Sequence, residues 1–452
     1  MKKIFQYIML AVVTIVMASC TSDIEETTAI AGKSNVQLVV GEFPAFGDSQ
    51  TRAIGTPDEG KTSWAEGDEL LLEMTSKTLG TKYAAFTYNG SSWELTSGEL
   101  SYKEDEVPTF PHVYYAPNYK WEAGKLVLKE GKVAGTDEYI EGTAQITPNG
   151  EAITVKFSGA TRNYSRLRIA TMPNKPITVD TEYFTPAGSS DMEQKGNYTL
   201  TSDEKGNACL YGTFENNSEV TVKYRGATLK TYKFSKETEN AKSYALDATV
   251  ISANSAEEIK SAIKQEVANS KTAIILNLAS DAGDNEFKTI REAFKNVQDA
   301  TIDLTLIGCK EIPADGLKEL NALKSIFLPD VTKIGMNALS RCVYLEEICA
   351  PNVSTIDERA FAGFIMLEKV TLGELTDVRG EANSGGGIFD DDNWTPYIDL
   401  YLPKNQEVMK GEFDENSNQY IWKPTGEKYF AIPDYDNGIF LGYQFNSVKS
   451  WE

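Results

Sequence analysis

The chain has 452 residues, more than one hydrophobic core usually holds, so we expect about two to four domains. Hydrophobic residues make up 41% and aromatic residues 10%, which is enough to build packed cores and excludes a wholly disordered chain. The formal net charge of −22 argues against a nucleic-acid or anionic-membrane partner held by basic patches.

The first residues read as an export signal. Lys2 and Lys3 precede an apolar run over 4–18, which is too short to span a membrane readily as a helix. The run leads into the motif "VMASC" at 16–20. The small residues before Cys20 resemble the lipobox of bacterial lipoproteins. We therefore expect 1–19 to be a lipoprotein signal peptide, with Cys20 acylated by palmitate-type chains that anchor the protein to the outer membrane. An ordinary secretory signal with an incidental cysteine is the alternative.

An acidic segment follows the predicted lipid anchor. We assign 20–33 to an acidic tether, and its cluster "TSDIEE" resembles the surface-export signal of Bacteroidetes lipoproteins. The resemblance implies that the protein reaches the cell surface. A solvated tether without an export role is the alternative.

Residues 34–251 read as β-structure. "NVQLVV" alternates apolar and polar residues, and Asn89–Gly90 between two strand patterns predicts a hairpin turn. Turn signals recur about every ten residues without a helical stripe, which is typical of antiparallel sandwiches. Because the stretch is longer than one sandwich needs, we divide it at "TPNG" into domains at 34–148 and 149–251.

Three segments of this β-rich stretch, 51–73, 113–117 and 153–170, resemble the fimbrillin family of Bacteroidetes. The turn of Trp64, Gly67 and Asp68 ahead of a strand contributes most, whereas the phrase from Phe157 lacks the histidine that often follows it in the family. The resemblance implies two transthyretin-like sandwich domains and assembly into surface fimbriae.

The same resemblance implies a mechanism of assembly. Fimbrillins are cleaved after an arginine near the start of the first sandwich, and the matching residue here is Arg52. Cleavage removes a strand, here the one carrying Val36, Leu38 and Val40, and a strand from a neighbouring subunit fills the groove. The alternative is that Arg52 is an exposed loop residue that no protease cuts.

The pattern changes after Val250. Ser255 and Glu258 form a capping box, and Ile259, Ile263 and Val267 lie on one face of a predicted helix over 255–269. A strand over 272–280 and a second helix over 285–298 follow. We therefore begin a new domain at 252.

From residue 304 onward, apolar positions recur every 22 residues. Fixed apolar columns separated by variable residues are typical of a solenoid, in which each unit buries a face of its neighbour. The L-x-x-I-x-L opening predicts leucine-rich repeats, and "IGMNAL" and "IDERAF" resemble the BspA-type in particular. The columns are Leu323, Leu345 and Leu367; Ile326, Ile348 and Val370; Leu328, Ala350 and Leu372; Val331, Val353 and Leu375; Ile334, Ile356 and Val378; and Ala338 and Ala360.

The predicted fold class is mainly β: two transthyretin-like antiparallel β-sandwich domains followed by a short leucine-rich-repeat α/β solenoid. We assign the repeat domain to 252–403, with a last strand at 397–403 and a loop at 381–394, and a C-terminal cap segment to 404–452.

Strand residues between the buried leucines line one sheet face, which commonly binds a partner in repeat proteins. Phe327 and Tyr401 are candidate anchors, since aromatic residues are enriched at binding hot spots. Packing of these rings against the terminal segment is the alternative. The candidate ligand-binding face consists of Asp303, Thr305, Ser325, Phe327, Glu347, Lys369, Thr371, Asp399 and Tyr401.

The sequence offers little support for catalysis, a metal or a cofactor. His112 is the single histidine, so two-histidine metal motifs are absent, and no GxSxG or P-loop occurs. The run Asp390–Asp392 lacks the spacing of a calcium loop. A pair of carboxylates for glycoside hydrolysis stays an open alternative, because the sequence does not reveal the distance between acidic side chains. We expect no enzyme activity, catalytic residue, metal site or cofactor.

The remaining cysteines lack a CxxC spacing and suggest no zinc site. We expect buried free thiols. A disulfide between any two of them is not deducible. They are Cys209, Cys309, Cys342 and Cys349.

Two functions from different classes fit these patterns. The first is a bacterial cell-surface lipoprotein acting in adhesion, a fimbrial subunit (for example at the tip) that assembles by strand addition and presents a repeat head to a host protein or glycan. The second is a surface lipoprotein that never polymerises and captures glycans or host proteins. An extracellular hydrolase would need activity that survives loss of His112 or depends on an unidentified carboxylate pair.

Overall fold

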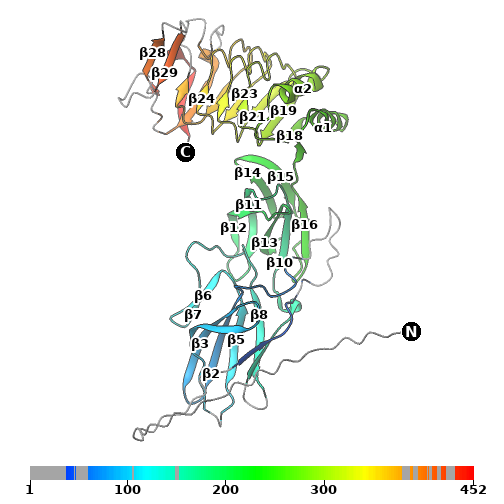
Figure 1. The fold of residues 1–452 in the computed structure, drawn as a ribbon, viewed down its shortest axis with the longest axis vertical. Coiled ribbons are helices and arrows are strands. Elements are labelled where there is room, and N and C mark those ends of the chain that lie inside the picture. Colours follow the sequence, from blue (N-terminus) through cyan, green and yellow to red (C-terminus); the bar gives the residue numbers. More distant parts are fainter. Residues whose placement is uncertain are drawn as a thin grey trace, which may run out of the picture.

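The computed structural model describes residues 37–44, 46, 60–103, 106–147, 152–378, 387–389, 395–404, 406, 410–414, 419–423 and 433–451. The fold is mainly β, with several sheets, and the described residues form two α-helices. Figure 1 shows the sheets in series along the long axis of the molecule, from the N-terminal strands to the C-terminal ones. The signal peptide, Cys20, the acidic tether and Arg52 lie outside the described residues, as does most of the predicted loop at 381–394.

The first sheet has the order β1-β9-β8-β5-β2-β3-β4, antiparallel except for the parallel pair β1–β9. Its end strands β1 and β4 contact each other, so the sheet folds around a core that includes Leu72, Val113 and Val155. A separate hairpin, β6–β7, lies beside β3. The strands are β1 (Gln37–Val40), β2 (Glu69–Ser76), β3 (Gly80–Tyr88), β4 (Trp93–Gly98), β5 (Thr109–Tyr115), β6 (Tyr119–Glu122), β7 (Lys125–Leu128), β8 (Ile140–Ile146) and β9 (Ala152–Phe157).

The turn motif at Trp64 has a structural explanation. The Trp64 ring meets Phe43, Trp93 and Tyr115 edge to face, which places it in the core of the first sheet. The Asp68 carboxylate accepts a hydrogen bond from the Ala65 N–H at 2.7 Å, and this closes the turn that leads into β2. The motif thus fixes where β2 begins.

The predicted boundary between residues 148 and 149 does not coincide with a change of sheet. β8 and β9 are antiparallel neighbours, and the Thr147 N–H donates to the Ala152 carbonyl at 2.8 Å. The strands on either side of 148–151 therefore belong to one sheet, and residues such as Pro, Asn and Gly, which occur in hairpin turns and linkers alike, do not distinguish the two cases. The change of sheet comes between Phe157 and Ser165.

The second sheet has the order β15-β14-β11-β13-β10-β16, and β12 also pairs with β11. Alternate residues of β13 and β14 are buried, which is the period of a strand with one face in the core. Phe184, Phe214 and Val222 are central to that core. The strands are β10 (Ser165–Ala170), β11 (Pro176–Pro186), β12 (Glu193–Thr201), β13 (Asn207–Phe214), β14 (Glu219–Tyr224), β15 (Ala227–Lys233) and β16 (Ser243–Asp247), preceded by the 3₁₀ turn η1 (Gly159–Thr161).

Both predicted helices are present, as α1 (Ala256–Ala268) and α2 (Asp284–Phe294). Ser255 caps α1 by accepting a hydrogen bond from the Glu258 N–H, and Ile259 and Ile263 are fully buried. α2 ends four residues earlier than the sequence suggested, at Phe294, and Val297 packs against the core from the following loop.

An eight-stranded parallel sheet, β17-β18-β19-β21-β23-β25-β27-β32, and a four-stranded parallel sheet, β20-β22-β24-β26, share one continuous core. Ile326, Ile348 and Val370 are direct neighbours, so the 22-residue step of the sequence is the step from strand to strand. Every predicted apolar column is buried. The strands are β17 (Ile251–Ala253), β18 (Ala273–Leu278), β19 (Ile302–Ile307), β20 (Glu311–Ile312), β21 (Leu323–Phe327), β22 (Lys333–Ile334), β23 (Glu347–Ala350), β24 (Thr355–Ile356), β25 (Lys369–Leu372), β26 (Asp377–Val378), β27 (Asp399–Pro403) and β32 (Ser447–Trp451).

The prediction that 397–403 is the last strand was wrong. β32 pairs in parallel with β27, placing Val448 beside Leu400, and Val448 is buried. The long segment between these two strands interrupts the 22-residue period, so no repeat pattern marks β32. The C-terminal segment also contains the hairpins β28 (Lys410–Asp414) with β29 (Gln419–Lys423) and β30 (Ile439–Phe440) with β31 (Tyr443–Gln444); the 3₁₀ turn η2 (Thr395–Tyr397) precedes β27. No helix among the described residues is long and apolar enough to cross a membrane.

Candidate functional site

The strand face predicted to bind a ligand consists of two columns of side chains that cross the eight-stranded sheet. Parallel pairing places residues two apart in each strand on the same face, about 4.8 Å from their counterparts in the next strand. All nine predicted residues lie in these columns. The first column is Asp303, Ser325, Glu347, Lys369, Asp399 and Ser447; the second is Thr305, Phe327, Cys349, Thr371, Tyr401 and Lys449.

Charges in the first column are paired with their neighbours. Ser325 Oγ donates to Asp303 Oδ1 at 2.6 Å, and Lys369 Nζ lies 2.7 Å from Glu347 Oε1. The hydrogen bond to Glu347 is the main cause that raises the pKa of Lys369. These partners are partly exposed, so each pair adds little stability, but their order sets an alternating pattern of charge along the face.

Asp399 is the most heavily hydrogen-bonded member of the first column. Its carboxylate accepts bonds from Asn446 Nδ2 at 2.7 Å, Ser447 Oγ at 2.6 Å and Lys449 Nζ at 3.0 Å. The hydrogen bond from Ser447, followed by those from Lys449 and Asn446, lowers the pKa of Asp399 below its ordinary value. Asp399, on β27, therefore links this strand to β32 through side-chain hydrogen bonds.

Tyr401 is covered in part by the terminal segment. The Nζ atoms of Lys369 and Lys449 lie 5.5 and 5.4 Å from the centre of its ring, within the range of cation–π contacts. Lys449 belongs to β32, so the Tyr401 ring packs against the terminal segment. Tyr401 itself lies on the strand face. The structure thus shows Tyr401 packed against the terminal segment, and its role as an anchor for a partner stays a prediction.

Phe327 lies against the second sheet. A Cβ atom on Gly226, in the turn between β14 and β15, would come within 3.4 Å of Phe327 Cζ. Gly226 has a φ of +92°, which glycine adopts readily. Figure 1 shows this end of the second sheet next to β18 and β21. Phe327 therefore contributes to the contact between the sheets, rather than serving as a free anchor for a partner.

Asp330 is the centre of this contact, which we call the joint. The side chain is 3% exposed and accepts hydrogen bonds from the Tyr224 hydroxyl at 3.0 Å and the Gly308 N–H at 2.9 Å. Arg225 and Lys310 pair with the same carboxylate, at 3.3 and 3.9 Å. Burial and the Asp330 carboxylate raise the pKa of Tyr224 to about 12.

Sequence reasoning missed the joint. The only available signal was an aspartate, Asp330, between the apolar columns at Leu328 and Val331, where the next repeat has Asn352. Asn352 Nδ2 donates to the Pro329 carbonyl at 2.7 Å. Asp330 instead accepts a hydrogen bond from the hydroxyl of Tyr224, at the end of β14 in the second sheet. The local pattern does not distinguish these two uses of the position.

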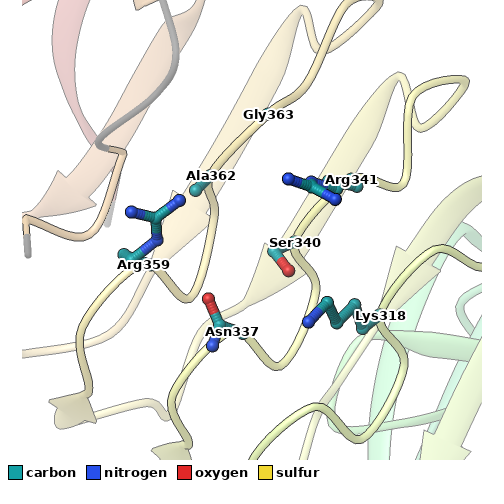
Figure 2. A pocket seen from close by; sticks show the side chains of 7 residues that line it. All are labelled: Lys318, Asn337, Ser340, Arg341, Arg359, Ala362 and Gly363. Atoms are coloured by element: carbon teal, nitrogen blue, oxygen red, sulfur yellow. The ribbon is translucent and has the colours of Figure 1, made fainter. Parts of the chain in front are cut away.

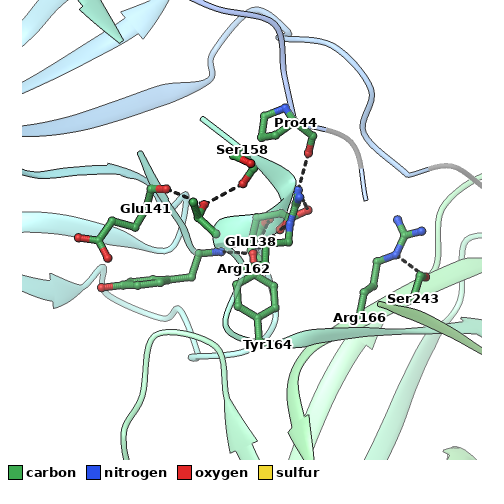
Figure 3. A network of polar contacts seen from close by, with 11 residues as sticks. Pro44, Glu138, Glu141, Ser158, Arg162, Tyr164, Arg166 and Ser243 are labelled. Carbon is green, nitrogen blue, oxygen red and sulfur yellow. Dashed lines mark hydrogen bonds and ion pairs between the residues drawn. The ribbon is translucent and has the colours of Figure 1, made fainter. Parts of the chain in front are cut away.

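A second network holds the chain that follows β1, as Figure 3 shows. Arg162 is buried, pairs with Glu138 at 3.0 Å, and donates from Nη2 to the Pro44 carbonyl at 2.8 Å. The Phe46 ring lies 4.0 Å from the Arg162 guanidinium and 4.8 Å from that of Arg166. β1 is thus part of the first sheet, whereas Phe46 packs against Arg166 and Tyr211 of the second sheet. Arg52 lies outside the described residues.

His112 lies on β5, exposed, with Nδ1 at 3.2 Å from Glu141 and 3.0 Å from the Tyr114 hydroxyl. Within the described ranges, no three histidine, cysteine or acidic side chains are grouped to hold a metal. None of the four described cysteines forms a disulfide; Cys309 and Cys342 are buried, and Cys209 and Cys349 are half-buried.

No protein-family model matches the chain, and no curated protein matches it in sequence. The function of the chain therefore has to be inferred from the columns, the joint and the attachment of β1.

Proposed function

We propose that the chain is a bacterial cell-surface lipoprotein of the fimbrillin kind, a fimbrial subunit or adhesin that presents a BspA-type leucine-rich-repeat head on two transthyretin-like sandwiches. The head comprises 252–403 with the cap segment 404–452. The sandwiches span 34–157 and 158–251, because the pairing of β9 with β8 moves the boundary from 148 to the end of β9. Cys20 carries the outer-membrane anchor. The observation that carries the proposal is the pair of polar columns across parallel strands at a 22-residue step.

The columns suit recognition of a host protein or glycan. The column residues repeat from one strand to the next, so an extended partner that crosses the sheet contacts the same backbone geometry at each strand. The side chain that it contacts differs from strand to strand. Glu347, Lys369 and Asp399 provide alternating charge, and charge patterns govern specificity more than affinity. The part of the face beyond Phe327, from β23 to β32, is the proposed contact region because the joint occupies the β21 end.

Strand addition is supported by the position of β1. Among the described strands, β1 is an edge strand of four residues that pairs only with β9, and it buries Leu38 in the core. Removal of β1 exposes the β9 edge and an apolar groove, which is what an incoming strand requires. Cleavage at Arg52 is the proposed step that releases it.

Assembly can be tested with the mature protein and an arginine-specific protease. We expect cleaved wild-type protein to form larger species with fimbrial subunits as concentration rises, measured by sedimentation velocity. The variant Arg52→Gln is the matched control and stays uncleaved and unassembled. An intact N-terminus on assembled material contradicts the cleavage step.

The attachment of β1 also favours the second candidate, a lipoprotein that does not polymerise. Trp64 Nε1 donates to the Gly41 carbonyl at 2.8 Å, and Arg162 Nη2 donates to the Pro44 carbonyl at 2.8 Å, so release of β1 with the residues after it breaks both hydrogen bonds. Cleaved protein that keeps its N-terminal fragment bound and remains monomeric supports this candidate. Surface labelling of intact cells, with Cys20→Ser as the control, tests the location that both candidates share.

A further inference from the structure

A polar hollow lies on the repeat region at the turns that follow the short strands β20, β22 and β24 (Figure 2). Its volume is about 470 Å³, within the range of about 300–1,000 Å³ usual for small-ligand sites. The hollow does not involve the two strand-face columns, so a ligand bound there is independent of the proposed function. It is lined by Lys318, Asn337, Ser340, Arg341, Arg359, Ala362 and Gly363.

The hollow arises because one turn is repeated with side chains of different length. Positions 318, 340 and 362 are equivalent at the 22-residue step, and the residue shortens from lysine through serine to alanine. Gly363 likewise leaves space, since a Cβ atom at this position would come within 3.1 Å of Arg341 Cγ. Small residues thus form the floor, while Lys318, Arg341 and Arg359 stand around it (Figure 2).

Three cationic side chains around one hollow contrast with the net charge of −22. Lys318 lies 3.0 Å from the carboxylate of Asp315, and Arg341 lies 3.6 Å from that of Glu319. The four side chains are 34–65% exposed, and ion pairs exposed to this extent are weak enough to rearrange around a stronger anion. Two guanidinium groups offer the forked donors that oxyanions prefer.

Ser340 supplies an independent observation. It is 3% exposed, lines the hollow, and its Oγ has no hydrogen-bond partner within the part of the chain that the structure describes. A buried hydroxyl without a partner is unfavourable, and a ligand hydroxyl or oxyanion at the floor would satisfy it. The Arg341 N–H donates to the Ala362 carbonyl at 2.8 Å and the Asn337 N–H to the Glu358 carbonyl at 3.1 Å, so the backbone around the hollow is held in place.

We propose that this hollow binds an acidic sugar, a hexose bearing a carboxylate or a sulfate group. Arg341 and Arg359 bind the anionic substituent, and Asn337 and Ser340 contact the ring hydroxyls. Among the described residues, the lining contains no aromatic side chain and is mainly polar, so a polar ligand is favoured over an apolar one. The volume exceeds what a bare inorganic anion needs, so a sugar ring accompanies the charge.

Isothermal titration of the full mature protein at low ionic strength tests the proposal. The probes are glucuronate, N-acetylglucosamine 6-sulfate, neutral N-acetylglucosamine and inorganic sulfate. We expect saturable binding of at least one of the two acidic sugars, at least about tenfold tighter than binding of the neutral sugar or of inorganic sulfate. The preferred sugar distinguishes carboxylate from sulfate as the recognised group.

Variants then locate the site. Arg341→Gln and Arg359→Gln are each expected to weaken binding by about tenfold, while Lys288→Gln, which removes an exposed charge from α2, leaves it unchanged. Asn337→Asp adds a negative charge without changing size and weakens binding too, in a conformation (φ 54°) that aspartate tolerates. Ser340→Ala weakens binding and does not lower the urea midpoint.

Three results overturn the proposal. The first is absence of saturable binding by either acidic sugar. The second is equal binding of inorganic sulfate, which would mean an adventitious anion site only. The third is unchanged affinity in Arg341→Gln, Arg359→Gln and Asn337→Asp when circular dichroism and urea midpoints show that these variants are folded.

Discussion

At the scale of single residues, the Asp399 carboxylate determines how firmly the last strand is attached. Its pKa lies below the ordinary 3.8 because Ser447, Lys449 and Asn446 donate to the charged form. A folded-state pKa below the unfolded one means that the unfolded chain binds more protons, so stability rises with pH. The contribution is therefore present above pH 3.8 and is lost as pH falls through the lower folded value.

Asp399→Asn is expected to lower the urea midpoint at pH 7 and to speed proteolytic release of the C-terminal strand. The difference from the wild-type midpoint should shrink once the pH falls below 3.8. Asp436→Asn, in an exposed turn, is the matched control. A difference that persists unchanged at low pH would contradict the role given to the Asp399 charge.

The Cys342 thiol should be unreactive while the protein is folded. Burial raises its pKa from 9.0 to about 12, and its Sγ donates to the Leu317 carbonyl at 3.1 Å. The thiolate fraction is then about a thousandfold smaller than for a free thiol. Because the folded pKa is raised, burial of the neutral thiol contributes its full stability below pH 9 and loses it as pH rises toward 12.

Alkylation by iodoacetamide at pH 8, followed by peptide mass spectrometry, checks this prediction. We expect Cys342 to be labelled only in urea, and half-buried Cys209 to be labelled earlier in a urea series. Equal labelling of Cys342 with and without urea is the outcome that would count against it.

At the scale of elements, the leucine columns carry the stability of the repeat region. Leu345 is 0% exposed and belongs to a single core that runs from Ala253 to Val448. Leu345→Ala should lower the free energy of unfolding by about 3 kcal/mol, from lost burial and the cavity left behind. Urea denaturation followed by circular dichroism measures it.

Lys324→Ala is the control for the column, because Lys324 is exposed on β21 and pairs with Glu346 at 3.8 Å. We expect a change of less than about 0.5 kcal/mol. Equal effects of Leu345→Ala and Lys324→Ala would mean that the 22-residue columns do not form the core.

At the scale of the whole molecule, the joint at Asp330 determines how the parallel sheet meets the second sheet. Tyr224 and Arg225 reach Asp330 from one side, and Gly308 and Lys310 from the other. Met172, Tyr224 and Ile307 bury an apolar cluster beside them. The placement of the strand face relative to the rest of the chain depends on these few contacts.

Asp330→Asn should therefore lower stability by about 2 kcal/mol, because the negative charge that pairs with Arg225 and Lys310 is lost and an NH2 group replaces one of the two acceptor oxygens. It should also speed proteolysis between β16 and β17. Arg225→Gln, which removes an exposed partner, is expected to cost less than about 1 kcal/mol. Denaturation and limited trypsin digestion measure both effects; a larger effect of Arg225→Gln would contradict the central role of Asp330.

Several elements were predictable because their signals are local. The hairpin after β3, the Ser255 cap of α1 and the buried columns each depend on residues within a few positions or one repeat of one another. Residues that are buried at regular intervals give a regular pattern of apolar residues in the sequence. The mainly β fold and the 22-residue spacing between neighbouring strands could therefore be inferred from the residue pattern alone.

What only the tertiary structure decided involves residues far apart in the chain. The predicted boundary at 148–149 falls between two paired strands, because residues such as Pro, Asn and Gly are common to hairpin turns and linkers. β32 was missed because a long segment separates it from β27. Phe327 faces the second sheet, and Asp330 pairs with Tyr224, through contacts that no local period encodes. Sequence periodicity determined which side chains are buried within each unit, whereas the packing of one unit on another determined which exposed residues remain available to bind.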